Sequence, residues 1–298
     1  MKGFNLKWLI VLVVIGLGVG AYFGLAKSPV EEAVGSFFAE MPTDSYRIGE
    51  KEFVAKVKAD EPMFILDIRR ADDYAKGHIK GAVNAPWGTA ISDNLELLPQ
   101  DQTIMVYCYS GQTAGQAVAL LNMAGFDAKS VNLGWNLGIS KVEGIDEIME
   151  TEENTFDGET VTINKKVKAA IVDYFQGMEQ VKGTTYTNYM ISVDDAKALL
   201  DEEDPDVVFL SIRRADDYIN GHIESAINIP FGKGMEVEFN TLPKDKKIIV
   251  YCYSGQTAGQ TVAGLRMLGY DAVSMNGGTG TPATAPNGWV NKGYPLVK

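Results

Sequence analysis

The sequence predicts a duplicated α/β protein with parallel sheets, and three observations lead to that prediction. An eleven-residue segment, VYCYSGQTAGQ, occurs at 106–116 and again at 250–260. Fourteen of the 22 residues from 67 to 88 recur without a gap from 211 to 232. Short apolar runs also alternate with helical patterns, which is typical of a parallel sheet covered by helices on both faces.

The predicted elements follow the same order in the two repeats. Short runs rich in β-forming residues predict strands at 64–68, 103–107, 207–212 and 247–251. A helix is expected after each repeated segment. These helices should end at Gly125 and Gly269, because glycine commonly terminates helices.

An amphipathic lead-in helix is predicted before each repeat. Asn164 is a suitable N-cap for the second one. Apolar residues recur at helical spacing in both segments, at Val30, Val34, Phe37 and Met41, and at Val167, Ile171, Tyr174 and Met178. We expect each lead-in helix to pack on its own domain.

Four segments follow from these patterns. They are an N-terminal anchor (1–27), a first domain with its lead-in helix (28–142), an acidic linker (143–163) and a second domain with its lead-in helix (164–298). In the second domain, Trp289 and Tyr294 are expected to hold the C-terminal tail against the fold.

The predicted anchor is a 19-residue uncharged run, Trp8–Ala26, long enough to cross a bilayer. Lys2 and Lys7 precede it, which predicts a cytoplasmic N-terminus and domains on the periplasmic side or cell surface. The alternative is a cleaved signal peptide and a secreted protein. Small residues at every fourth position could support a weak homodimer through the anchor: Gly16, Gly20 and Gly24.

The formal net charge of −12 argues against a nucleic-acid partner, because phosphate binding requires a basic face.

Cys108 and Cys252 are the two cysteines of the chain. A disulfide between them is one alternative, but it would require the equivalent loops of two domains to meet. Reactive thiols in identical loops are the favoured interpretation.

Each cysteine is predicted to lie between the end of a strand and the start of a helix. Backbone N–H groups converge there and the helix dipole favours negative charge, so the thiol is expected to ionise readily. Gly111 and Gly255 would let the loop curl around the sulfur. The predicted cradle comprises Tyr109, Ser110, Gly111, Gln112 and Thr113, and likewise Tyr253, Ser254, Gly255, Gln256 and Thr257. The two threonines could instead cap the helices.

These motifs resemble those of tandem rhodaneses, the thiosulfate sulfurtransferase-like proteins. The resemblance rests on Asp67-Ile-Arg69, Asp73-Tyr74, Gly77-His78-Ile79 and the Cys108 loop, with their counterparts in the second repeat. It implies two α/β domains and a sulfurtransferase that carries sulfane sulfur as a persulfide on Cys108 and Cys252. A small sulfur donor, such as thiosulfate, a polysulfide or a persulfide, and a thiol or protein acceptor are the implied partners.

The second repeat departs from this pattern at Ser211, which stands where the first has Asp67. The resemblance implies a supporting role for Asp67, so the geometry of the second site could differ. Arg69 and Arg213 are supporting candidates, with a structural ion pair as the alternative. Neither cysteine loop contains a basic residue, which weakens the case for the thiosulfate dianion as donor.

Other chemistry has weaker support. His78 and His222 could act as bases, but packing explains a Gly-His-Ile turn better. No cofactor and no metal site are expected. A phosphatase would require an arginine where Ala114 and Ala258 stand. A carrier of sulfur or a thiol-redox module for a partner protein, with little turnover of its own, remains the alternative function, and an inactive scaffold is a further one.

Overall fold

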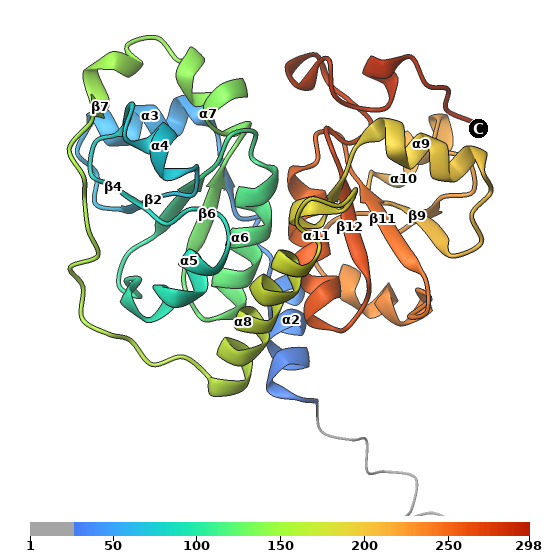
Figure 1. Ribbon diagram of the computed structural model, residues 1–298, viewed down its shortest axis with the longest axis horizontal. Coiled ribbons are helices and arrows are strands. Elements are labelled where there is room, and N and C mark those ends of the chain that lie inside the picture. Colours follow the sequence, from blue (N-terminus) through green and yellow to red (C-terminus); the bar gives the residue numbers. More distant parts are fainter. Residues whose placement is uncertain (1–26) are drawn as a thin grey trace, which may run out of the picture.

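The computed structural model describes residues 27–298, so the predicted membrane anchor lies outside the described part of the chain. Among these residues no helix has the length and apolar character needed to cross a bilayer. The described chain forms two similar halves, coloured blue to green and yellow to red in Figure 1.

The first half contains the helices α2 to α7 and the strands β1 to β7. The helices are α2 (Pro29–Ala39), α3 (Glu50–Lys58), α4 (Ala71–Tyr74), α5 (Thr89–Asp93), α6 (Gln112–Met123) and α7 (Gly134–Leu137). The strands are β1 (Arg47–Ile48), β2 (Phe64–Asp67), β3 (His78–Ile79), β4 (Ala82–Asn84), β5 (Ile104–Tyr107), β6 (Ala128–Val131) and β7 (Met149–Glu150).

The second half repeats this order with fewer short elements. Its helices are α8 (Lys165–Gln180), α9 (Val193–Asp201), α10 (Ala215–Asn220) and α11 (Gln256–Met267). Its strands are β8 (Met190–Ile191), β9 (Val207–Ser211), β10 (Ile227–Asn228), β11 (Lys247–Tyr251) and β12 (Ala272–Met275).

The two main sheets have the same parallel topology. The first has the order β1-β6-β5-β2-β4, and the second has β8-β12-β11-β9-β10 when read from the equivalent edge. The central pair of each sheet keeps an equivalent register, since Asp67 lies opposite Tyr107 and Ser211 opposite Tyr251. These strands confirm the predicted α/β class, and α6 and α11 confirm the predicted helices after the repeated segments.

The two halves meet where α6 packs against α11, between the two sheets (Figure 1). Glycines permit this close approach. A Cβ atom at Gly115 would lie 2.3 Å from the carbonyl oxygen of Gln256, and one at Gly259 would lie 2.4 Å from that of Gln112. Real Cβ atoms do not come this close to backbone oxygens, so any larger side chain would push the helices apart.

The lead-in helices do not pack only on their own halves, and this expectation was wrong. In α2, the ring of Phe38 meets Phe239 of the second half edge-on, with 5.2 Å between centroids. In α8, Phe175 meets Trp87 of the first half in the same way, also at 5.2 Å. An apolar stripe shows which face of a helix is buried, but the partner depends on which apolar surface lies nearest in the fold.

The packing produces one hydrophobic core that runs through both halves. It includes Phe38, Phe175, Phe239 and Trp289, each at most 2% exposed. A smaller core covers the opposite face of the first sheet. The predicted role of Trp289 is confirmed, because its indole N–H donates to the carbonyl oxygen of Pro295 (2.8 Å) in the tail.

The segment predicted as a linker contains ordered structure. Ile145 and Ile148 are buried in a short 3₁₀ helix, and β7 follows directly. The N–H of Gly81 donates to the Glu150 carboxylate (2.7 Å), which fixes this strand on the first half. The acidic composition concealed these few apolar residues. The chain also stays on the first half beyond Glu150, since the N–H of Asn154 donates to the Tyr74 hydroxyl (3.0 Å) and Phe156 stacks on Phe64 with 6.1 Å between centroids.

We predict that Gly259→Ala destabilises the protein, because its Cβ would collide with the backbone of α6. The expected loss is about 1–3 kcal/mol in the free energy of unfolding, measured by chemical denaturation. Gly35→Ala is the matched control, since a Cβ there has no atom within 4 Å. This control should be neutral or slightly stabilising; equal losses in the two variants would contradict the proposed helix contact.

Candidate functional site

Each cysteine is the first residue after a central strand. Cys108 follows β5 and precedes α6, and Cys252 follows β11 and precedes α11. Both are free thiols and only 2% exposed, so no disulfide joins them in this structure. The carboxyl ends of parallel strands are where α/β proteins usually place their functional groups.

Backbone N–H groups point at both sulfurs. The N–H groups of Gly111 and Ala114 donate to Sγ of Cys108, at 3.1 and 3.4 Å. The N–H of Gly255 donates to Sγ of Cys252 at 3.1 Å. Such donors stabilise negative charge on sulfur better than they stabilise a neutral thiol.

The loop conformation requires glycine after each cysteine. Gly111 and Gly255 adopt φ values of 86° and 94°, in the left-handed region that other residues rarely occupy. They are also the N-cap residues of α6 and α11, without any side-chain cap. Thr113 and Thr257 therefore do not cap these helices, which removes that alternative for their role.

A second pair of glycines packs against the backbone of the cysteine loops, and the sequence analysis did not predict their role. The N–H of Trp135 donates to the Cys108 carbonyl oxygen (2.7 Å), and that of Thr279 to the Cys252 carbonyl (2.8 Å). A Cβ at the adjacent Gly134 or Gly278 would lie within 2.5 Å of these carbonyl oxygens. The repeat spacing could have revealed them, because the two glycines are 144 residues apart in the sequence, as the two cysteines are.

The glutamine side chains of the predicted cradle turn away from the sulfur and join the two halves. The amide nitrogen of Gln112 donates to the Ser274 hydroxyl (2.8 Å), and that of Gln256 donates to Ser130 (2.8 Å). Both glutamines are buried. Each cysteine loop is therefore linked, through the first residue of its helix, to the sheet of the opposite half.

The tyrosines next to the cysteines are held by acidic residues. The Tyr109 hydroxyl donates to Asp73 (2.5 Å) and accepts from the N–H of Arg70 (3.1 Å). This hydroxyl, followed by Lys76 and Arg70, holds the pKa of Asp73 well below its usual range. The equivalent hydroxyl, that of Tyr253, donates to Asp217.

The supporting arginines differ between the halves. Arg69 is buried and forms an ion pair with Asp67, with 2.6 Å between the nearest nitrogen and oxygen atoms. Burial opposes the charge of Arg69, but its contacts with Asp67 outweigh this and raise its pKa. Arg213 is also buried, but its guanidinium donates to carbonyl oxygens, those of Gly221 (2.7 Å) and Asp217 (2.8 Å).

The histidines have the same packing role in both halves. The His78 ring stacks on Tyr74, with centroids 3.5 Å apart, and its Nδ1 lies 2.9 Å from the carbonyl oxygen of Tyr74. His222 stacks on Tyr218 with the same backbone contact. Both rings are thus engaged in local structure, as the Gly-His-Ile turn suggested.

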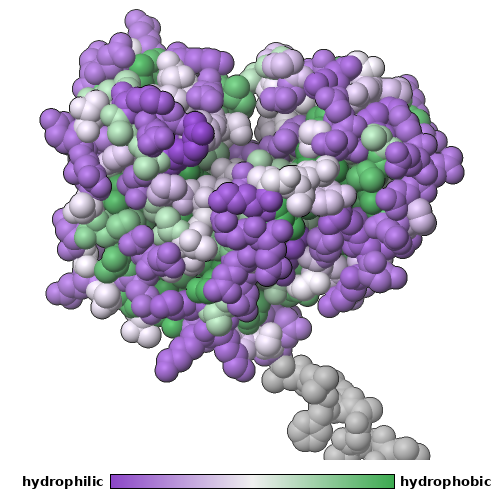
Figure 2. Space-filling view, in the orientation of Figure 1, coloured by the Kyte–Doolittle hydropathy of each residue, from purple (hydrophilic) through white to green (hydrophobic). Residues whose placement is uncertain are grey.

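A cavity of about 480 Å³ lies beside Cys108, and both halves line it. Ser110 and Thr113 of the predicted cradle contribute to its wall. It also contains two basic residues, Arg70 and Lys182, although the loops themselves have none. Their positions could not be read from the sequence, because Lys182 reaches the site from the other half. Figure 2 shows a mainly hydrophilic face with a notch between the halves.

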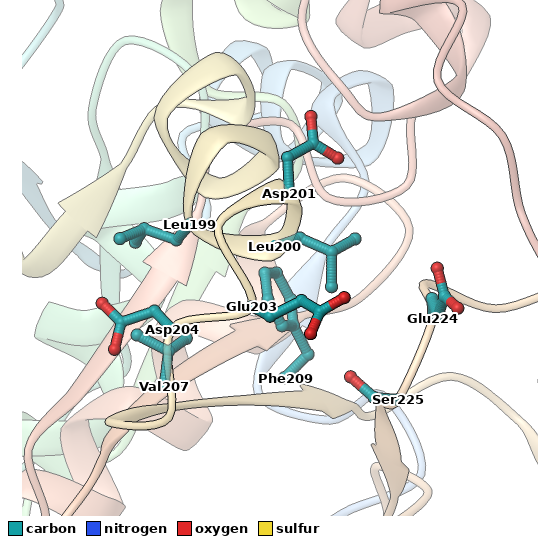
Figure 3. Close-up of a pocket in the computed structure, with 9 residues that line it drawn as sticks. All are labelled: Leu199, Leu200, Asp201, Glu203, Asp204, Val207, Phe209, Glu224 and Ser225. Carbon is teal, nitrogen blue, oxygen red and sulfur yellow. The ribbon is translucent and has the colours of Figure 1, made fainter.

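Another hollow, of about 440 Å³, contains neither cysteine. It lies between the end of α9, β9 and the segment at 224–225 (Figure 3). Carboxylates line it, from Asp201, Glu203, Asp204 and Glu224. Such a site would repel anionic sulfur compounds, so it does not compete with the Cys108 cavity. Residues 27–298 contain no cluster of side chains suited to holding a metal ion.

The curated relatives each match less than half of this chain. YrkF of Bacillus subtilis (strain 168), a candidate sulfur carrier protein, is 33% identical over 92 residues, covering 31% of this chain and 49% of YrkF. The thiosulfate:glutathione sulfurtransferase of Saccharomyces cerevisiae is 26% identical over 136 residues, covering 42% of this chain and 94% of that protein. The chain thus spans about half the length of the first relative.

The chain is also similar to a solved structure over 78% of its length. SseA of Escherichia coli, described as a 3-mercaptopyruvate sulfotransferase, is 18% identical with a TM-score of 0.35 and covers 78% of this chain and 98% of its own.

The model of the rhodanese-like domain matches residues 50–140 and 192–280, which together make up more than half of the chain. Each match contains one cysteine loop with its strand and helix. The chain therefore belongs to the rhodanese-like domain family and carries two copies of that domain.

Proposed function

We propose that this protein is a sulfurtransferase that moves sulfane sulfur through persulfides on Cys108 and Cys252. The observation that carries the proposal is the set of backbone N–H donors at each Sγ, from Gly111 and Ala114 and from Gly255. Family membership and the sulfur-related names of the relatives support it.

The proposed reaction consists of two displacements. The cysteine thiolate attacks the outer sulfur of the donor, a new S–S bond forms, and the donor's own bond to that sulfur breaks. The leaving group departs with the electron pair, as sulfite from thiosulfate or as a thiolate from a persulfide. An acceptor thiolate then attacks the terminal sulfur and releases the cysteine thiolate, so no external oxidant is needed.

The loop geometry suits both states of the cysteine. The N–H groups at the N-termini of α6 and α11 can stabilise a thiolate, and they can also stabilise a persulfide whose terminal sulfur carries the charge. Neither half lacks its cysteine or its loop glycine. We therefore propose that both sites accept sulfur.

A sulfur carrier with little turnover is the second candidate, favoured by the similarity to YrkF. It predicts a stable sulfur adduct but slow transfer to small thiols.

For the location of the protein, we propose the periplasmic side or the cell surface, on the basis of the apolar run Trp8–Ala26 and its flanking lysines.

The buried arginines of the two halves differ in their partners, because Arg69 pairs with a buried carboxylate and Arg213 donates to carbonyl oxygens. The hydroxyl of Ser211 replaces the carboxylate, and Nε of Arg213 has no hydrogen-bond partner in the described chain. The second site thus has the arginine without the buried carboxylate that pairs with it in the first.

The adduct prediction concerns the purified full-length chain and its Cys108→Ser, Cys252→Ser and doubly substituted variants. After exposure to thiosulfate, polysulfide or a persulfide donor, intact-mass analysis should show one added sulfur in each single variant. The double variant should show none. Absence of an adduct with all three donors would exclude both the transferase and the carrier.

The ion-pair prediction uses opposite substitutions in the two halves. Asp67→Ser should lower the free energy of unfolding by about 3–5 kcal/mol, because it leaves Arg69 buried without its partner. Ser211→Asp should raise it, because the new carboxylate can pair with Arg213. Denaturant titration measures both effects, and a loss of stability in Ser211→Asp would contradict the assigned role of the missing carboxylate.

A further inference from the structure

The cavity beside Cys108 is much larger than an inorganic sulfur donor requires. Its volume of about 480 Å³ lies in the range of roughly 300–1,000 Å³ that is typical of sites for small organic ligands. The first half contributes Cys108, Arg70 and Trp87 to the wall, and the second half contributes Met178 and Lys182. This composition combines apolar surface with two cations and one carboxylate, that of Glu179.

Lys182 belongs to a segment that the first half does not have. The offset between the repeats is 137 for Met41 and Met178, but 143 for Tyr46 and Tyr189, so the second connection is six residues longer. The two tyrosines correspond in structure as well, since both have left-handed φ values, of 56° and 52°. The extra residues lie between Met178, near the end of α8, and Tyr189, which precedes β8.

Lys182 is available for a ligand. Its side chain is 71% exposed, and its ammonium group contacts the Glu179 carboxylate at 3.1 Å. Exposed pairs of this kind contribute little to stability, so an anionic ligand in the cavity can compete for the ammonium group at small cost.

The wall near Cys108 contains another donor that differs between the halves. Trp87 lines the cavity, and its indole N–H has no acceptor among the described residues. In the repeat alignment Phe231 stands at this position in the second half and has no such donor. The connection at 42–46 contains no lysine, and its charged residue, Asp44, pairs with Lys129 at 2.7 Å.

We infer that Lys182 is a specificity-determining residue for Cys108 alone, and that this site exchanges sulfur with an anionic organic thiol or its persulfide. The inference rests on the proposed sulfur transfer. In the step concerned, the thiolate of the organic acceptor attacks the outer sulfur of the Cys108 persulfide. A new S–S bond forms, the bond to Cys108 Sγ breaks, and its electron pair returns to Cys108 as the thiolate. The ammonium group of Lys182 binds the carboxylate of the acceptor and takes no part in the bond changes.

The test measures each cysteine site alone, and it compares a charged acceptor thiol with a neutral one. In the Cys252→Ser background, Lys182→Gln should raise the KM for 3-mercaptopropionate about two- to fivefold and leave that for neutral 3-mercaptopropionamide unchanged. In the Cys108→Ser background, neither KM should change. Lys166→Gln is the matched control, because Lys166 is an exposed lysine near the start of α8, the helix whose end precedes Lys182.

Four outcomes would overturn the inference. An equal effect on the charged and the neutral thiol would mean that Lys182 only shapes the loop, and an equal effect at Cys252 would remove the specificity for Cys108. An unchanged KM for both thiols, with normal loading of Cys108, would exclude a role for Lys182 while leaving the proposed transfer intact. If Cys108 cannot be loaded at all, the proposed function and this inference both fail.

Discussion

The close contact between α6 and α11 is the constraint on which the rest of the structure depends. It exists because Gly115 and Gly259 present no side chain to the opposing backbone. Each of these helices begins at a cysteine loop, so joining the helices also brings both loops to the boundary between the halves. The hydrogen bonds of Gln112 and Gln256 to the opposite sheet then fix the loops relative to one another.

This arrangement explains how a duplicated sequence can support two unequal sites. The strand, the loop and the helix repeat, so the backbone donors around the two sulfurs are similar. The surroundings do not repeat, because the Cys108 loop shares a cavity with the lead-in segment of the second half, and that segment is longer than its counterpart in the first half. Lys182 and Met178 therefore line the cavity beside Cys108, although they lie about seventy residues from it in the sequence. Asymmetry arises from the connections, while the chemistry of the loop is shared.

Much of the fold could be predicted because it depends on local patterns. Apolar runs of β-forming residues became β2, β5, β9 and β11, and glycines of left-handed conformation ended α6 and α11 as expected. The linker was different. Its acids outnumber Ile145 and Ile148, yet these two side chains anchor the segment, because burial of a few apolar groups outweighs the average composition. The glutamines of the loops were predicted as part of the cradle, but their amides serve the contact between the halves.

The sequence by itself determined the duplication, the α/β class, the two cysteine loops and the requirement for glycine within them. These features depend on residue identity and on spacing along the chain. Only the tertiary structure decided which surfaces the lead-in helices cover, that both halves share a hydrophobic core, and which residues border Cys108. The physical reason is that an amphipathic pattern specifies a face to be buried, whereas its partner is chosen by shape and proximity across the whole fold.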